Sequence, residues 1–246
     1  MKRRAGRRGD AQNLRRSWAE AASDLIERAP TLLIAAGAAL FHLLLYGLAN
    51  RFPSGPAMLL RETWMDRASP LLAWTSWIYA SSHALILTAY WLSPRTQGAR
   101  TRFVVVFVVT IALSVLIHWA LPVRFPRELY PLQGEGLSVD LLRWVREIDH
   151  STSAFPSLHV AMAAAAALQA IRQRLRAAPA LGLWALAVAL STLTTKQHYA
   201  ADVVAGAALA VAVDWAVWRL ATRGGAQGLR GPAGIAPARR GTGLAL

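Results

Sequence analysis

The sequence predicts an all-α fold, an integral membrane bundle of six transmembrane helices with an interfacial N-terminal helix and an outer-loop helix. Hydrophobic residues make up 55% of the 246-residue chain, above the roughly 45–50% that is usual in soluble domains. They also gather into six runs, each close to the roughly 20 residues that a helix needs to cross a hydrocarbon core of about 30 Å. The runs cover residues 31–49, 70–92, 103–121, 157–173, 179–195 and 199–219.

The chain divides into three predicted regions. Residues 1–29 are a basic cytoplasmic arm followed by an interfacial helix at 17–28, where Trp18 and Leu25 share one helical face. Residues 30–222 are the six-helix membrane domain. Residues 223–246 are rich in Gly, Pro, Ala and Arg and are predicted to be a disordered tail. We expect no cleavable signal peptide, because the first apolar run starts only near Pro30 and lacks a convincing cleavage site.

The charge distribution argues for a membrane partner rather than nucleic acid. The net charge is +14, but the positive residues lie in the tails and in short loops between the apolar runs. Ten tryptophans, several of them near the ends of these runs, fit an interfacial aromatic belt. The chain has no cysteine, which excludes disulfides, thiolate chemistry and thiolate metal sites.

The orientation follows from the positive-inside rule. If the N-terminus is cytoplasmic, the inner segments carry 19 of the 27 Lys and Arg residues. We therefore expect an inner (plasma) membrane protein with both termini in the cytoplasm. The third run then leaves the membrane at Pro122, the fourth re-enters at Ser157 and the sixth begins near His198. One non-cytoplasmic face, periplasmic or exterior, thus receives six polar residues: Arg124, Arg127, His159, Lys196, His198 and Asp202.

The outer loop at 123–156 contains a predicted helix of its own. Residues 138–140 (Ser-Val-Asp) can cap a helix over 139–149, in which Leu141, Leu142, Trp144, Val145 and Ile148 form an apolar stripe. Such a helix lies on the outer interface, either as a lid over the site or as a packing helix.

Two histidines and one carboxylate are the candidate catalytic residues. His198 and Asp202 have i, i+4 spacing, so on a helix the carboxylate can orient the imidazole for nucleophilic attack. His159, on another helix, can act as general acid. Ser157, Arg124, Arg127 and Lys196 are the candidate phosphate-binding residues, because helix N-termini and cations attract anions. Two histidines and a carboxylate could also hold zinc, but no HExxH motif or carboxylate cluster supports a metal site.

Two strings of residues resemble a known family. Residues 156–159 (PSLH) and 196–206 (KQHYAADVVAG) resemble the type-2 phosphatidic acid phosphatase superfamily, and within it the inositol phosphorylceramide synthase-like branch. The resemblance covers about 120–205. It implies that His198 is the nucleophile that forms a phosphohistidine, that Asp202 orients it, and that His159 protonates the leaving alcohol. It also implies that no metal or other cofactor is needed.

The chain departs from the superfamily pattern at two motifs. The first motif has a lysine seven residues before an Arg-Pro pair, but Ile117 and Ala120 stand seven residues before Arg124 and Arg127. Which arginine binds phosphate therefore stays open. The third motif usually starts Ser-Arg, where this chain has Ser191-Thr192, and Lys196 can supply the missing charge.

Together these features predict a membrane lipid phosphatase or phosphotransferase. Its substrate is a lipid phosphate or phospholipid at the non-cytoplasmic leaflet, and transfer adds an alcohol acceptor lipid. The alternative is a non-enzymatic membrane transporter or scaffold. His83, with Tyr79 and Ser82 in the second run, and His42 in the first run either line the substrate cavity or make interhelical hydrogen bonds. A structural hydrogen bond is expected for His118. The oligomeric state stays open.

Overall fold

The computed structural model describes residues 17–18, 20–27, 29, 31–95, 98–149 and 152–223. The predictions for the basic arm at 1–16 and for the tail from 224 onward lie outside these residues.

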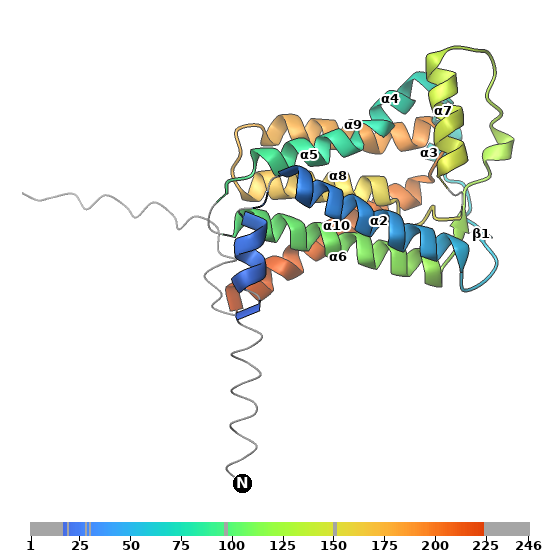
Figure 1. Cartoon of the computed structure of the whole chain (residues 1–246). Coiled ribbons are helices and arrows are strands. Elements are labelled where there is room, and N and C mark those ends of the chain that lie inside the picture. Colours follow the sequence, from blue (N-terminus) through green and yellow to red (C-terminus); the bar gives the residue numbers. More distant parts are fainter. Residues whose placement is uncertain are drawn as a thin grey trace, which may run out of the picture.

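The described chain is mostly helical, which confirms the all-α class (Figure 1). The α-helices are α2 (Thr31–Arg51), α3 (Trp64–Ala68), α4 (Ser76–Ala80), α5 (Ser82–Leu92), α6 (Ala99–Ala120), α7 (Leu137–Ile148), α8 (Leu158–Arg172), α9 (Ala178–Thr194) and α10 (Ala200–Arg223). The chain also contains a helix at residues 20–27, two short 3-10 helices, η1 (Ala73–Thr75) and η2 (Arg127–Leu129), and two short strands, β1 (Met58–Leu59) and β2 (Val123–Arg124).

Helix α8 is at the centre of the bundle, because it packs against α5, α6, α9 and α10. Its sequence is rich in alanine, and Ala161, Ala163, Ala165 and Ala166 are buried. Small side chains let neighbouring helices approach closely. The closest approach is to α10 at Gly206, where an added Cβ atom would lie 2.5 Å from the carbonyl oxygen of Ser157.

Two of the described helices, at Ala99–Ala120 and Ala200–Ala221, are long and apolar enough to cross a membrane. Three further apolar helices are shorter, at Ala36–Ala49, Leu158–Arg172 and Ala178–Thr194. Large apolar side chains face outward on several helices, such as Leu40 and Leu44 of α2 and Val204 and Val211 of α10. Outward-facing apolar side chains of this kind suit contact with lipid. The six-span topology itself stays a prediction.

The prediction of one continuous helix over 70–92 was wrong. This segment contains η1, α4 and α5, with a turn at Ser81 between the last two. Hydroxyl groups compete here for backbone carbonyls: Thr75 donates to the Leu72 carbonyl at 2.7 Å and Ser81 to the Ile78 carbonyl at 2.7 Å. Such bonds to nearby backbone weaken the regular helical pattern.

The helix predicted in the loop 123–156 is present as α7. It begins at Leu137 after Gly136, two residues before the predicted start, and Gly136 has a φ of 123° that suits glycine. Ser138 is not the cap. Its hydroxyl accepts a hydrogen bond from the Trp77 indole at 3.1 Å, which fixes α7 against α4.

The predicted interfacial helix near the N-terminus is helical at residues 20–27 and contacts the start of α6. The Ser23 and Thr101 hydroxyls lie 2.9 Å apart, and the Glu27 carboxylate accepts a hydrogen bond from the Thr101 backbone N–H at 3.2 Å. A carboxylate at this position complements the positive end of the α6 dipole. Trp18 and Leu25 stay exposed, so an apolar surface remains available for an interface.

Candidate active site

Three chain segments meet at one end of the bundle, beside the starts of α8 and α10 (Figure 1). Strands β1 and β2 pair in parallel, Met58 opposite Val123 and Leu59 opposite Arg124. The segment before α8 joins them, because Ser153 bridges to Val123 and the Ala154 N–H donates to the Val123 carbonyl at 2.9 Å. This small sheet fixes the backbone of Ala154 next to the histidines.

The two sequence-predicted histidines come together because α8 and α10 start side by side. The Ser157 N–H donates to the Asp202 carbonyl at 3.0 Å, and Gly206 allows the close helix approach. His159 lies in the first turn of α8, and His198 lies just before α10. Their ring centroids are 6.4 Å apart.

His198 is held by two acceptors on the same ring nitrogen. Its Nδ1 atom lies 2.9 Å from the Ala154 carbonyl oxygen and 3.4 Å from Oδ2 of Asp202. A carbonyl oxygen can only accept a hydrogen bond, so Nδ1 carries the proton. In the neutral ring the lone pair is then on Nε2, the nitrogen that can attack an electrophile.

His198 lies outside α10, so the i, i+4 helical geometry considered from the sequence does not apply to His198 and Asp202. Helix α10 begins only at Ala200, and Asp202 lies in its first turn, where it accepts a hydrogen bond from the Tyr199 N–H at 2.8 Å. The left-handed backbone of Lys196, with a φ of 55°, turns the chain between α9 and α10. The Asp202 carboxylate and the His198 imidazole still lie within 3.4 Å of each other. The Thr192 carbonyl, which accepts a hydrogen bond from the His198 backbone N–H at 3.3 Å, helps to hold His198 there.

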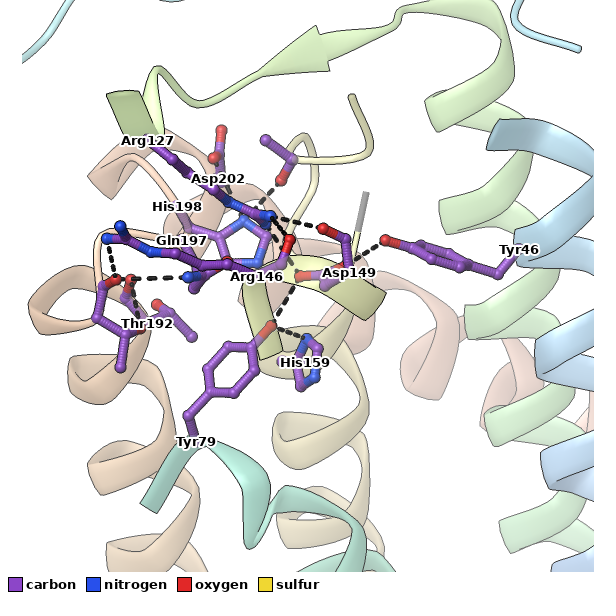
Figure 2. Close-up of polar contacts among 12 residues, drawn as sticks. Tyr46, Tyr79, Arg127, Arg146, Asp149, His159, Thr192, Gln197, His198 and Asp202 are labelled. Carbon is purple, nitrogen blue, oxygen red and sulfur yellow. Dashed lines mark hydrogen bonds and ion pairs between the residues drawn. The ribbon is translucent and has the colours of Figure 1, made fainter. Parts of the chain in front are cut away.

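His159 has a hydrogen-bond partner, Tyr79, which the sequence indicates as a cavity residue but does not pair with His159. The Tyr79 hydroxyl lies 3.0 Å from Nδ1 of His159 and 3.1 Å from Oδ2 of Asp149, so Tyr79 bridges the two residues (Figure 2). Tyr46 also donates a hydrogen bond to Asp149. Asp149 follows an amphipathic helix and belongs to no motif, so only the fold brings it to His159.

Arg127 and Arg146 lie beside this cluster. Arg127 forms an ion pair with Asp149 at 3.3 Å and donates to the Asp149 carbonyl at 2.5 Å. Arg146 donates to the carbonyls of Tyr130 at 2.8 Å and Thr195 at 3.4 Å. Among the described residues, the buried Nε atom of each arginine has no hydrogen-bond partner. Both donors are therefore available to an anion.

The charge states of this loop follow from burial and from neighbouring charges. Burial, with the nearby charge of Arg127, lowers the pKa of the Arg146 guanidinium to about 10, which still leaves it charged near neutral pH. Burial raises the pKa of the Asp149 carboxyl, but His159 and Arg127 outweigh it, so that this pKa lies below its usual value. Asp149 is thus a carboxylate that only accepts hydrogen bonds.

Three predicted phosphate-binding residues have other contacts. Arg124 is exposed and pairs with Glu128 at 2.6 Å. Lys196 is buried, donates to the Asp66 carbonyl at 2.6 Å and lies over the Tyr130 ring, and burial lowers its pKa. Ser157 is the N-cap of α8, with its hydroxyl accepting from the Val160 N–H at 3.4 Å. Of the four residues predicted to bind phosphate, Arg127 is the one that contacts Asp149, the carboxylate to which Tyr46 and Tyr79 donate.

A cavity of about 440 Å³ opens beside the two histidines. Apolar side chains make up much of its wall, including Leu43, Trp144 and Ile148 from α2 and α7. The polar part of its lining is His42, Tyr46, Tyr79, His83, Asp149, Ser153, His159 and His198. His42 and His83 therefore belong to the cavity wall, one of the two roles expected for them. A cavity of this size and lining suits a small polar group joined to an apolar chain.

The histidine of the third apolar run, His118, has a structural contact. His118 is buried, and its Nε2 atom lies 2.9 Å from the Pro156 carbonyl oxygen. This is the structural hydrogen bond that the sequence predicts, and it ties α6 to the segment before α8.

The fold and the site define a helical protein with paired histidines at one end of its bundle. The chain belongs to the PAP2 superfamily, whose family model matches residues 55–216. Membership indicates a phosphatase or phosphotransferase acting on a phosphorylated lipid or small molecule. A search of curated proteins finds no match, and neither does a search of solved structures.

Proposed function

We propose that this protein is a membrane lipid phosphatase or phosphotransferase that works through a phosphohistidine on His198. The observation that carries the proposal is the double restraint on Nδ1 of His198 by Ala154 and Asp202. This restraint leaves Nε2 as the lone-pair nitrogen in a cavity that His159 shares. Such a pair suits nucleophilic attack with general acid assistance.

The reaction has two steps. In the first, Nε2 of His198 bonds to phosphorus, the bond from phosphorus to the ester oxygen breaks, and that oxygen takes a proton from His159. In the second, His159 accepts a proton from water or from an acceptor alcohol, whose oxygen displaces His198 from phosphorus. Asp202 stabilises the positive charge that His198 carries while phosphorylated. Neither step draws on a metal ion, and activity is expected to persist in a chelator.

Arg127 and Arg146 are the phosphate-binding residues in this proposal. Their free Nε donors and mutual repulsion favour a bound anion. In this proposal the two arginines take the place of the lysine and arginine of the superfamily's first motif, which this sequence lacks. Ser157 contributes indirectly, by capping the helix whose positive end faces the phosphate. Arg124 and Lys196 play no direct part: their charged groups are bonded to Glu128 and to the Asp66 carbonyl, and neither has a buried donor left without a partner among the described residues.

The finer assignments are a lipid substrate at the non-cytoplasmic leaflet and a place in the inositol phosphorylceramide synthase-like branch. The apolar cavity wall supports a lipid, and the PSLH and KQHY strings support the branch. Because hydrolysis and transfer share the phosphohistidine, both remain part of the proposal.

The test is an assay of the purified protein with three substrates: phosphatidic acid, an isoprenyl pyrophosphate, and a phospholipid mixed with ceramide. We expect phosphate release or head-group transfer from at least one, unchanged by EDTA and abolished by His198→Ala. No turnover of any of them would contradict the proposal. The alternative, a transporter or scaffold, requires instead that His198→Ala leaves function intact.

A further inference from the structure

Asp149 gathers three side-chain donors from three separate parts of the chain. Tyr46 of α2 and Tyr79 of α4 donate their hydroxyls, and Arg127 of η2 forms an ion pair. The carboxylate is half-buried at the edge of the cavity. No step of the proposed mechanism uses it, although a carboxylate held in this way is costly to desolvate. Its place in the site therefore calls for a function.

The connection from Asp149 to His159 passes through a single hydroxyl. Tyr79 has one O–H proton, and Asp149 is a carboxylate that only accepts, so this proton points to Asp149. The phenol oxygen must then accept from Nδ1–H of His159. The ring centroids of Tyr79 and His159 also lie 4.1 Å apart, with the ring planes tilted by 32°, and this contact restrains the imidazole (Figure 2).

This order of protons determines what His159 can do. With Nδ1–H directed to Tyr79, Nε2 is the nitrogen left for the substrate, and it carries a proton only when the ring is an imidazolium. A phenol that donates to a carboxylate is a better acceptor than a free phenol, because hydrogen bonds in a chain polarise one another. The negative charge of Asp149 thus stabilises the protonated ring.

We propose that Asp149 and Tyr79 form a relay that orients His159 and stabilises the imidazolium form from which it delivers a proton to the leaving oxygen. The inference rests on the proposed function and deepens it. As the bond from phosphorus to the leaving oxygen breaks, that oxygen receives the electron pair and the Nε2 proton of His159. His159 becomes neutral and keeps its Nδ1–H bond to Tyr79. Tyr79 and Asp149 are positioning residues, since each acts on the reaction through His159.

The relay predicts a dependence on the leaving group. An alkyl ester such as phosphatidic acid needs a proton on its leaving oxygen, whereas 4-nitrophenyl phosphate releases a stable phenolate without one. General acid catalysis contributes roughly 10²–10⁴-fold. Tyr79→Phe should therefore lower kcat on phosphatidic acid about tenfold or more, with little change in KM, and lower kcat on 4-nitrophenyl phosphate less than about threefold. Asp149→Asn should also lower kcat more on phosphatidic acid than on 4-nitrophenyl phosphate, with a smaller difference between the two substrates than in Tyr79→Phe.

Tyr90→Phe is the matched control. It removes a buried hydroxyl from α5, in the same part of the chain but outside the cavity lining, and both activities should stay within about twofold of the wild type. Equal losses on both substrates in Tyr79→Phe would overturn the relay, because they indicate a structural role. No loss on either would overturn it too. Failure of the proposed function looks different: the wild type itself would turn over neither substrate.

Discussion

At the scale of single residues, the site depends on which hydrogen bonds each charged group has already made. Arg127 and Arg146 each use their terminal nitrogens on backbone carbonyls and keep a buried Nε donor without a partner in the described chain. Arg124 is the opposite case, an exposed cation with its own carboxylate. Arg127 and Arg146, the proposed phosphate-binding residues, therefore differ from Arg124 in having a buried Nε donor that no described residue uses.

This difference can be measured with alanine variants. Hydrogen bonds to a charged group are worth about 1.5–3 kcal/mol, so Arg146→Ala and Arg127→Ala should each lower kcat/KM about tenfold or more, mainly by raising KM. Arg124→Ala is the control and should change kcat/KM less than about threefold, since exposed ion pairs contribute roughly 0–1 kcal/mol. Steady-state kinetics with a water-dispersible phosphate ester provide the measurement. A larger loss in Arg124→Ala than in Arg146→Ala would contradict this assignment.

Some residues of the site could be predicted from the sequence and others could not. His159, His198 and Asp202 follow from two short strings at the starts of apolar runs, where a polar residue costs free energy and therefore signals function. Tyr79 and Asp149 lie in segments without a motif, and their role depends on a contact across 70 residues of chain. The contact of Lys196 could not be predicted from the sequence either, because its acceptor is a backbone carbonyl of α3, that of Asp66.

At the scale of elements, the site depends on how closely α10 approaches α8. Glycine at 206 makes this approach possible, because any Cβ atom there would meet the backbone oxygen of Ser157 at 2.5 Å. A helix backbone cannot move aside as a flexible side chain can. The separation of His159 from His198 is therefore set in part by one missing methyl group.

Gly206→Ala should accordingly destabilise the fold and weaken activity. Overpacking of this kind costs about 1–3 kcal/mol, and the displaced helix start moves His198 from His159. Gly182→Ala is the matched control, since an added Cβ on α9 meets no heavy atom of the described residues within 4 Å. It should be neutral or slightly stabilising, because alanine favours helix over glycine. Thermal unfolding in detergent and the phosphate-release assay measure both effects; equal behaviour of the two variants would contradict the packing argument.

The apolar runs predict some helices closely and fail at the second run, where hydroxyl side chains interrupt the helix. Apolar runs at 103–121 and 199–219 correspond closely to α6 and α10, because long apolar stretches leave the backbone few alternatives to helix. The run at 70–92 contains Thr75 and Ser81, whose hydroxyls donate to carbonyls three residues earlier, and Ser76, whose hydroxyl donates to the Ser138 carbonyl of α7. A hydropathy scale treats Ser and Thr as only mildly polar. It therefore does not predict that their hydroxyls form hydrogen bonds with backbone carbonyls and interrupt the helix.

At the scale of the whole molecule, the topology remains the prediction with the widest consequences. The Lys and Arg distribution predicts that the loop at 123–156, with Arg127, Arg146 and Asp149, faces away from the cytoplasm. The substrate then reaches the cavity from the outer leaflet. Both termini lie on the cytoplasmic side in this arrangement.

Cysteine labelling tests the topology without background, because the chain has no cysteine of its own. Gln133→Cys places a thiol at an exposed position of the predicted outer loop, and Pro94→Cys places one in a predicted inner loop. An impermeant maleimide applied to intact cells should label the first variant and not the second, and both should be labelled after the membrane is opened. The reverse pattern would show that the site faces the cytoplasm.

Rapid quenching with a ³²P-labelled substrate shows whether His198 carries the phosphoryl group. We expect a labelled protein whose label survives alkali and is lost in mild acid, as a phosphohistidine requires, and no label in His198→Ala. His159→Ala should still form the label from an ester with a good leaving group. A wild-type protein that turns over substrate without such a label, or a label that persists in His198→Ala, would contradict the account.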